Sequence, residues 1–172
     1  DDITSACFED LLSQQGEGAG WRMGAVMSQG LSSRKAGVWA RDAQLWGGNL
    51  SVLCSLVGSP YLPTISGGVL FLEDVGEHPY RIERMLTQLL HAGILGRQKA
   101  IVLGQFTDFR LGAHDQGFGL PRVVAWLRSQ LKVPVLTDLP FGHVPTRVCL
   151  PVGARIDLLV EGRDVMMVWG HV

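Results

Sequence analysis

Short apolar runs alternate with amphipathic segments along the middle of the chain. The stretch VLFLED, residues 69–74, opens with four apolar residues after a Gly pair, and KAIVLGQF covers residues 99–106. Continuous apolar runs of this length indicate strands that are buried on both faces. The stretch VPVLTDLPFGH, residues 133–143, predicts a third strand that leads into a loop.

Apolar positions spaced three and four residues apart predict helices between these strands. The segment 79–92 begins at Pro79, which suits the first turn of a helix, and carries a single apolar stripe. A similar stripe predicts a helix over 121–131. We expect two further helices, at residues 3–13 and 49–57.

The two ends of the chain have a less regular pattern. Residues 14–20 predict a loop, and short candidate strands follow near 22–28 and 36–41. The tail, residues 147–169, predicts two or three strands, with EGRD at 161–164 as a hairpin turn. The order strand, helix, strand, helix, strand predicts an α/β fold with a parallel core, to which the tail adds antiparallel strands.

Composition excludes several classes of protein. The chain has 172 residues, 47% hydrophobic and 18% charged, which favours one ordinary domain with a sizeable core over disorder. A net charge of −1 without a Lys/Arg run gives nucleic-acid binding little electrostatic support. The apolar runs are too short to span a bilayer, so we expect no membrane partner.

Cysteine usage and the start of the chain suggest a cellular setting. Three widely spaced cysteines argue against a disulfide framework or a zinc site and favour a reduced, cytoplasmic environment. The first dozen residues carry acids where a secretory signal would carry Lys or Arg. The chain begins with Asp1 in what resembles a helix already under way, so we expect a fragment of a longer protein.

Polar residues stand at the carboxyl ends of the three expected parallel strands: Glu73 and Asp74, then Gln105, Thr107 and Asp108, and then Asp138 and His143. Ligands gather at this edge of a parallel sheet. Neighbouring strands could bring Glu73 and His143 together, and a carboxylate beside an imidazole prepares that imidazole to act as a general base. The alternative is that both are unrelated polar residues on exposed loops.

A nucleophile for such a pair is hard to find in the sequence. No G-x-S-x-G turn is present, and Ser51, Cys54 and Ser55 lie in an apolar helix where packing explains them. Ser59 and Ser66 lie beside proline and glycine, as turn residues do. A Glu/His pair without a nucleophile would fit a half-site.

Other candidate sites each have a simpler explanation. The GGN stretch at 47–49 could bind an anion through its backbone N–H groups, or it could be a turn with Asn49 as the N-cap. Trp46 could stack on a ligand or belong to the core. A metal could be bound by Asp108, His114 and Asp115, but their spacing matches no standard site, so we expect none.

Four stretches in consistent order resemble the muramoyl-tetrapeptide LD-carboxypeptidases: WGGNLSVLCSLVGSPYLP, GGVLFLEDVGEHPYRIERMLTQLLHAGIL, KAIVLGQF and PFGH…LPVGA. These are serine peptidases related to the microcin C self-immunity proteins. The similarity covers about residues 44–153. It implies a swivelling β/β/α-type domain with a small parallel core sheet. Residues 44–172 would form a carboxy-terminal catalytic half-domain, and residues 1–43 would form an inter-domain segment with a peripheral helix and strands.

The resemblance also implies a division of the catalytic residues between two domains. Family members carry the nucleophilic serine in a Gly-x-Ser-Asp turn of their first domain, whereas the second domain supplies a glutamate and a histidine. These fall on Glu73 and His143. No Gly-x-Ser-Asp sequence occurs in this chain, so we expect it to be inactive alone. Trp46, Gly47, Gly48 and Asn49 are the candidate lining of the substrate cleft.

The implied reaction is removal of terminal D-alanine from murein tetrapeptides during cell-wall recycling in the cytoplasm. It needs no cofactor. The expected partners are the tetrapeptide, the missing amino-terminal nucleophile domain and a second copy of the chain in a homodimer. The alternatives are a peptide-nucleotide hydrolase of the microcin type and a non-catalytic binding or assembly module.

Overall fold

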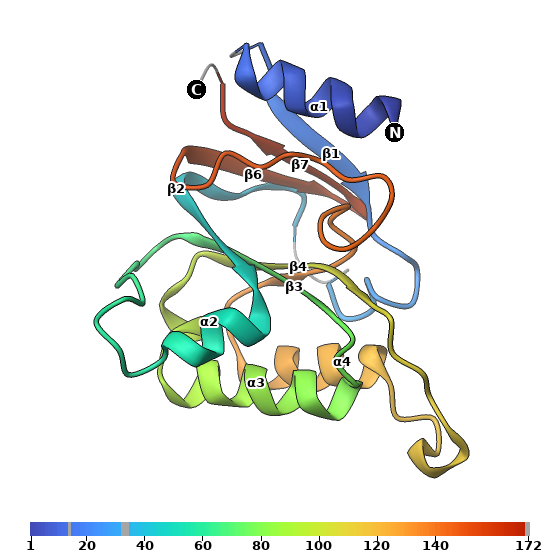
Figure 1. Cartoon of the computed structure of the whole chain (residues 1–172). Helices are drawn as coiled ribbons and strands as arrows, with labels where there is room; N and C mark the ends of the chain where they lie inside the picture. Colours follow the sequence, from blue (N-terminus) through green and yellow to red (C-terminus); the bar gives the residue numbers. More distant parts are fainter. Residues whose placement is uncertain (14, 32–34, 171–172) are drawn as a thin grey trace.

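A single β-sheet contains all the strands of the described residues (Figure 1). The computed structural model describes residues 1–13, 15–31 and 35–170. Seven strands lie in the order β1-β7-β6-β2-β3-β4-β5. Their bounds are β1 Gly18–Arg22, β2 Gly37–Asn49, β3 Val69–Val75, β4 Ala100–Thr107, β5 Val135–Leu136, β6 Arg155–Glu161 and β7 Asp164–Val168.

Strand β2 belongs to both halves of this sheet. It pairs in parallel with β3, which continues through β4 to β5, and antiparallel with β6, which continues through β7 to β1. The α-helices are α1 Asp2–Leu12, α2 Leu50–Leu56, α3 Pro79–His91 and α4 Leu120–Gln130. Helices α2, α3 and α4 cover one face of the parallel strands, and the antiparallel half lies over the other face (Figure 1). This arrangement confirms the expected α/β class with a parallel core and added antiparallel strands.

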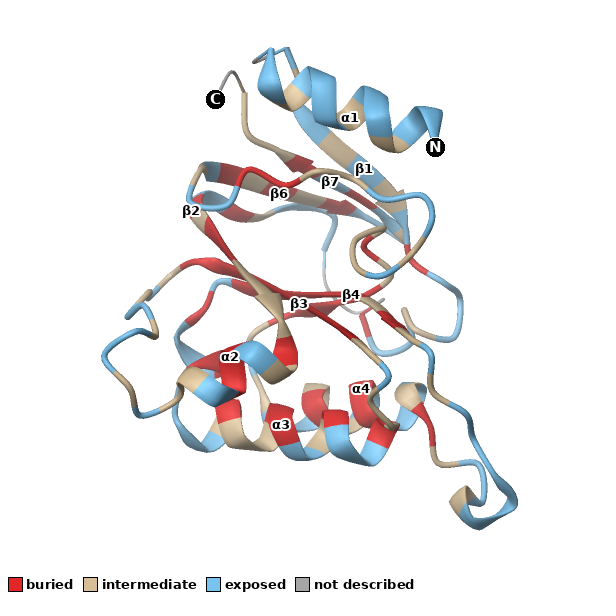
Figure 2. Cartoon of the chain, in the orientation of Figure 1, coloured by how far each residue is buried: buried red, intermediate tan, exposed pale blue. Residues whose placement is uncertain are grey.

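Strand β3 lies between two hydrophobic cores. Leu70 and Leu72 belong to the core that includes the helices, whereas Val69 and Phe71 belong to the core that includes the antiparallel strands. Figure 2 shows β3 and β4 coloured as buried between these two layers. Side chains alternate between the two faces of a strand. The next two residues, Glu73 and Asp74, are therefore directed to opposite faces at the end of the strand.

The helices, the buried strands and the hairpin follow the sequence pattern closely. The four helices begin and end within one or two residues of the expected bounds, and the hairpin turn joins β6 to β7 between Glu161 and Asp164. No helix in the described part of the chain is both long and apolar enough to cross a membrane.

Three expectations about the strands are wrong. The third parallel strand is only Val135–Leu136, because the backbone turns at Asp138, whose φ is 64°. The first strand occupies Gly18–Arg22, so it begins inside the expected loop and ends where the strand expected near 22–28 should begin, because it pairs with β7. The strand expected at 36–41 extends to Asn49. The division of the chain between residues 43 and 44 stays a prediction. Residue 14 of the expected loop and residues 171–172 of the expected half-domain lie outside the described residues.

Candidate active site

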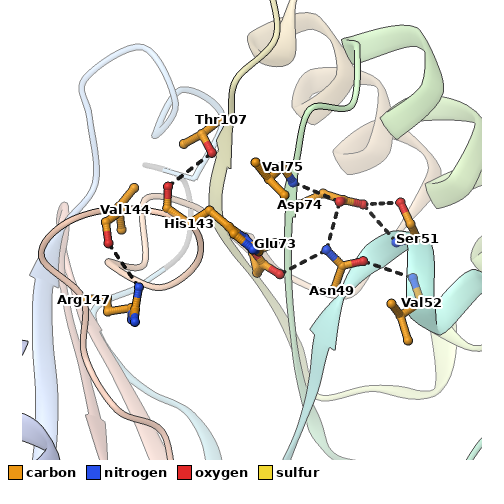
Figure 3. Close-up of polar contacts among 10 residues, drawn as sticks. All are labelled: Asn49, Ser51, Val52, Glu73, Asp74, Val75, Thr107, His143, Val144 and Arg147. Carbon is orange, nitrogen blue, oxygen red and sulfur yellow. Dashed lines mark hydrogen bonds and ion pairs between the residues drawn. The ribbon is translucent and has the colours of Figure 1, made fainter.

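The structure brings Glu73 and His143 together. The Nδ1 atom of His143 lies 3.0 Å from Oε2 of Glu73, although the two residues are 70 positions apart (Figure 3). Glu73 stands near the end of β3, and His143 lies in the loop after β5. The glutamate is only 4% exposed, whereas the histidine side chain is 57% exposed. The carboxylate is thus inside the fold, and the imidazole that it contacts faces outward.

The end of β4 holds the loop that carries His143. The backbone N–H of Gln105 donates to the carbonyl oxygen of Phe141 at 2.8 Å, and the hydroxyl of Thr107 donates to the carbonyl oxygen of His143 at 3.3 Å. The Gln105 side chain also donates to the carbonyl of Leu139 at 3.1 Å. Two of the polar residues at this strand end, Gln105 and Thr107, therefore position the loop.

Gly142, just before the histidine, is required by close packing. Its φ is 131°, and a Cβ atom there would lie 3.0 Å from both Oε2 of Glu73 and the carbonyl oxygen of Gln105. Gly104 on β4 has the same role from the other side, because its Cβ would lie 2.6 Å from the carbonyl oxygen of Phe141. A side chain at either position would separate the histidine loop from the sheet.

Asn49 contacts the second oxygen of Glu73. It is the register partner of Glu73 in the parallel pairing of β2 and β3, and its Nδ2 donates to Oε1 of Glu73 at 3.2 Å. Its Oδ1 accepts the N–H of Val52 at 3.1 Å, so Asn49 is also the N-cap of α2. Each oxygen of the buried glutamate therefore has a polar partner.

Asp74 is buried, at 3% exposure, and is fully engaged within the fold. Its Oδ2 accepts the N–H of Ser51 at 2.9 Å and the hydroxyl of Ser51 at 2.6 Å, while its Oδ1 accepts Nδ2 of Asn49 and the N–H of Val75, each at 2.9 Å. Sequence reasoning assigned Ser51 to packing and missed this contact. The only available signal was the pair of acids after an apolar strand, which demand polar partners.

This geometry is suited to proton transfer. A carboxylate at Nδ1 favours the tautomer whose proton is on Nδ1, which leaves Nε2 free to accept a proton. The same carboxylate stabilises the imidazolium that then forms. A general base and an orienting acid would need this arrangement.

Residues 42–158 match the family described as the LD-carboxypeptidase C-terminal domain. The chain belongs to this family. The match covers the parallel core, the histidine loop and part of β6, and so includes every residue of the site described above.

Relatives of this LD-carboxypeptidase domain are longer proteins. It is similar to the crystal structure of muramoyltetrapeptide carboxypeptidase from Oxalobacter formigenes, with a TM-score of 0.84 and 40% identity, over 99% of this chain and 55% of that one. It is 36% identical over 113 residues to the murein tetrapeptide carboxypeptidase of Pseudomonas aeruginosa, which is 65% of this chain and 36% of that relative. The chain therefore spans only about a third of the length of such curated relatives.

A more distant relative is the microcin C7 self-immunity protein MccF of Escherichia coli. It is 25% identical over 126 residues, which is 72% of this chain and 36% of MccF. The structure of MccF in complex with glutamyl sulfamoyl guanosine superposes with a TM-score of 0.73 at 21% identity and so shows a shared fold.

The structure corrects the expectation that Trp46 lines the cleft of this LD-carboxypeptidase domain. Trp46 is 4% exposed and belongs to the core beneath the helices, where its Nε1 donates to Oε1 of Gln98 at 3.0 Å. Its ring leaves no surface for stacking on a ligand. The competing interpretation of Trp46 as a core residue is the right one.

Gly47 and Gly48, which follow Trp46, differ in how much space a side chain would have. A Cβ atom at Gly47 would lie 1.9 Å from the carbonyl oxygen of Phe71, so the close approach of β2 and β3 explains this glycine. Gly48 has a φ of 145°, and a Cβ atom there would meet no atom within 4 Å. Its backbone is therefore open on one side, and a contact of Gly48 with substrate stays a prediction.

Asp115, one of the three candidate metal ligands, is paired with a histidine. Nε2 of His78 lies 3.1 Å from Oδ1 of Asp115. The backbone N–H of Gly112, with a smaller contribution from His78, holds the pKa of Asp115 below its ordinary value. Within residues 1–13, 15–31 and 35–170, no group of three His, Cys, Asp or Glu side chains is arranged to hold a metal ion.

Cys54 has the properties of a core thiol in this domain. Burial raises its pKa to about 11, against a smaller opposing effect of Arg84. Its Sγ lies 3.4 Å from the carbonyl oxygen of Met85. Because the thiolate is the reactive form, Cys54 is unsuited to act as a nucleophile at neutral pH.

Proposed function

We propose that this domain supplies the glutamate and histidine of a Ser-His-Glu triad in an LD-carboxypeptidase that removes terminal D-alanine from murein tetrapeptides. The observation that carries the proposal is the 3.0 Å contact between the buried Glu73 carboxylate and the exposed His143 ring. Family membership and the two carboxypeptidase relatives support the substrate class. The resemblance favours a role in cytoplasmic cell-wall recycling.

In the proposed reaction, His143 acts first as a base and then as an acid. Its Nε2 takes the proton of a serine hydroxyl as that oxygen attacks the carbonyl before D-alanine, and Glu73 stabilises the resulting imidazolium. The same nitrogen then gives the proton to the amine of the departing D-alanine. Water completes the cycle by the same route and releases the tripeptide.

The serine of this proposal comes from a domain that precedes this one. The relatives are longer than the chain, and the family is that of a C-terminal domain. The His143 side chain is 57% exposed although its Nδ1 contacts Glu73, and a serine from another domain needs such exposure to reach the ring.

A chimera provides the test. The part of the Oxalobacter formigenes enzyme that precedes the matched region is fused to this chain, and release of D-alanine from a muramoyl tetrapeptide is measured. We expect no turnover from the chain alone and measurable turnover from the chimera. His143→Ala should then reduce kcat/KM by roughly 10⁴-fold or more, as the loss of a triad base does.

His91→Ala is the matched control, because His91 is exposed in the last turn of α3, away from the site. It should leave turnover unchanged. A His143→Ala chimera that retains most of its turnover would contradict the proposal, as would a folded chimera that releases no D-alanine.

The alternatives receive less support. Hydrolysis of a peptide-nucleotide antibiotic relied on Trp46 as an aromatic surface, and that ring is buried. A non-catalytic module would be favoured by a histidine packed among apolar side chains, whereas His143 is exposed and contacts a carboxylate.

A further inference from the structure

The side-chain amide of Asn49 bridges two adjacent carboxylates (Figure 3). Its Nδ2 lies 3.2 Å from Oε1 of Glu73 and 2.9 Å from Oδ1 of Asp74. An amide nitrogen carries two hydrogen atoms, so this contact uses both. Asn49 therefore has no amide hydrogen left for a substrate.

Three contacts fix the orientation of this amide. If it were flipped, its oxygen would face both carboxylates and its nitrogen would face the N–H of Val52, which now donates to Oδ1. The flip would lose three hydrogen bonds and create repulsive contacts in their place. Asn49 consequently presents only a donor to Glu73.

Asp74 in turn is held by α2 and by its own strand. Ser51 donates to Oδ2 through its N–H and its hydroxyl, and the N–H of Val75 donates to Oδ1. The aspartate is therefore a fixed acceptor that orients Asn49. None of these contacts involves a cation that would compete with an imidazolium for the charge of Glu73.

The contact with Glu73 determines which oxygen faces the histidine. Glu73 is buried, so Oε1 would lack a partner without Asn49, and an unpaired buried oxygen is costly. The carboxylate would turn to find another donor and move Oε2 away from Nδ1 of His143. Tight control of this geometry matters because small displacements of reacting groups greatly reduce turnover.

We propose that Asn49 is a positioning residue, oriented by Asp74, whose amide fixes the Glu73 carboxylate and through it the orientation and tautomer of His143. This role replaces direct contact between the Asn49 side chain and substrate. The inference rests on the proposed function for its effect on turnover. Its effect on the His143 tautomer is independent of any activity.

The first experiment measures the ¹⁵N shifts of the His143 ring in this chain at about pH 9, where a neutral imidazole reports its tautomer. The variants are Asn49→Ser and Asn49→Asp, because both keep an oxygen that can cap α2 but lose the amide group whose two hydrogens bridge Glu73 and Asp74. We expect the Nδ1-protonated form to dominate in the parent chain and to fall below half in both variants. Ser55→Ala, in the same helix but bonded to the carbonyl of Val52, is the control and should change nothing.

The second experiment measures Asn49→Ser in the chimera. A positioning role predicts that kcat falls by about 10²-fold while KM stays within about twofold. A rise in KM with unchanged kcat would overturn the inference in favour of substrate binding. Unchanged ring shifts in both variants, with urea midpoints showing intact folds, would also overturn it. If the parent chimera is inactive, the proposed function fails and the ring shifts alone decide the inference.

Discussion

Glu73 and Asp74 stand where a core strand would usually carry apolar residues. Burying a carboxylate is unfavourable unless it is hydrogen-bonded, and here every carboxylate oxygen of the pair has a partner. Two residues near the start of α2, Asn49 and Ser51, supply most of the donors to Asp74. The local sequence GGNLS is therefore as much a part of the site as LED.

Gly47 is the glycine whose replacement should most disturb the site. The added methyl group of Gly47→Ala would overlap the carbonyl oxygen of Phe71 and separate β2 from β3. We expect it to lower the free energy of unfolding by more than about 3 kcal/mol in urea titrations.

Gly48→Ala is the matched control for that experiment. Its φ is equally unfavourable for alanine, but the methyl group would meet no atom within 4 Å. Only backbone strain remains, which is about 1–2 kcal/mol. Equal losses in the two variants would show that close packing of the strands is not the cause.

At the scale of elements, Arg128 joins three segments. From α4 its guanidinium donates to the carbonyl oxygens of Val135 in β5 and of Met27 and Gln29 in the turn before β2. Burial lowers the pKa of Arg128 to about 10, so the side chain stays charged at neutral pH. It is a structural cation, because its contacts are to backbone carbonyl oxygens of two other segments.

Arg128→Met should therefore destabilise the chain by about 2 kcal/mol, since the partly buried carbonyl oxygens of Val135 and Met27 would lose charged donors. Urea unfolding measures the loss. Arg122→Met, at an exposed position of the same helix, should stay within about 0.5 kcal/mol of the parent. If Arg128→Met lowered the free energy of unfolding no more than Arg122→Met does, the result would contradict this structural role.

The elements that the sequence predicts well are those with a strong local pattern. Helices α3 and α4 carry clear apolar stripes, and β3 and β4 are continuous apolar runs, so their bounds follow from the residues. Strand β1 has the weak sequence GAGWR and exists because β7 pairs with it, which no local pattern reveals. Strand β5 is short for a local reason, the turn at Asp138, that apolarity alone does not indicate.

Some residues of the site likewise follow from the local sequence pattern, whereas others depend on the tertiary structure. The strand-end positions of Glu73 and His143 indicated that the two could meet, but the pattern alone left open that they are unrelated loop residues. The pairing of Asn49 with Glu73 depends on the register of β2 against β3, and the contact of Ser51 with Asp74 depends on how α2 packs. Both contacts depend on the tertiary structure. The sequence alone therefore left two interpretations of Asn49 open, an N-cap and part of an anion-binding site. The burial of Trp46 is a tertiary fact of the same kind.

At the scale of the whole molecule, the two terminal segments differ greatly in how far they are built into the fold. Helix α1 has no buried residue, whereas β7 places Val165 and Met167 in the core and pairs with both β1 and β6. We expect deletion of residues 1–13 to cost less than about 2 kcal/mol and deletion of residues 164–172 to leave the chain unfolded. Near-ultraviolet circular dichroism and urea titration compare the two, and equal losses would contradict this account.

The pairing of β1 with β7 joins residues from opposite ends of the chain. During translation, the ribosome releases Gly18–Arg22 long before its partner has been made. The early strand keeps open backbone groups until Asp164–Val168 has been synthesised, and it is exposed to wrong partners throughout. Strand β1 can therefore complete its pairing only after β7 has been synthesised.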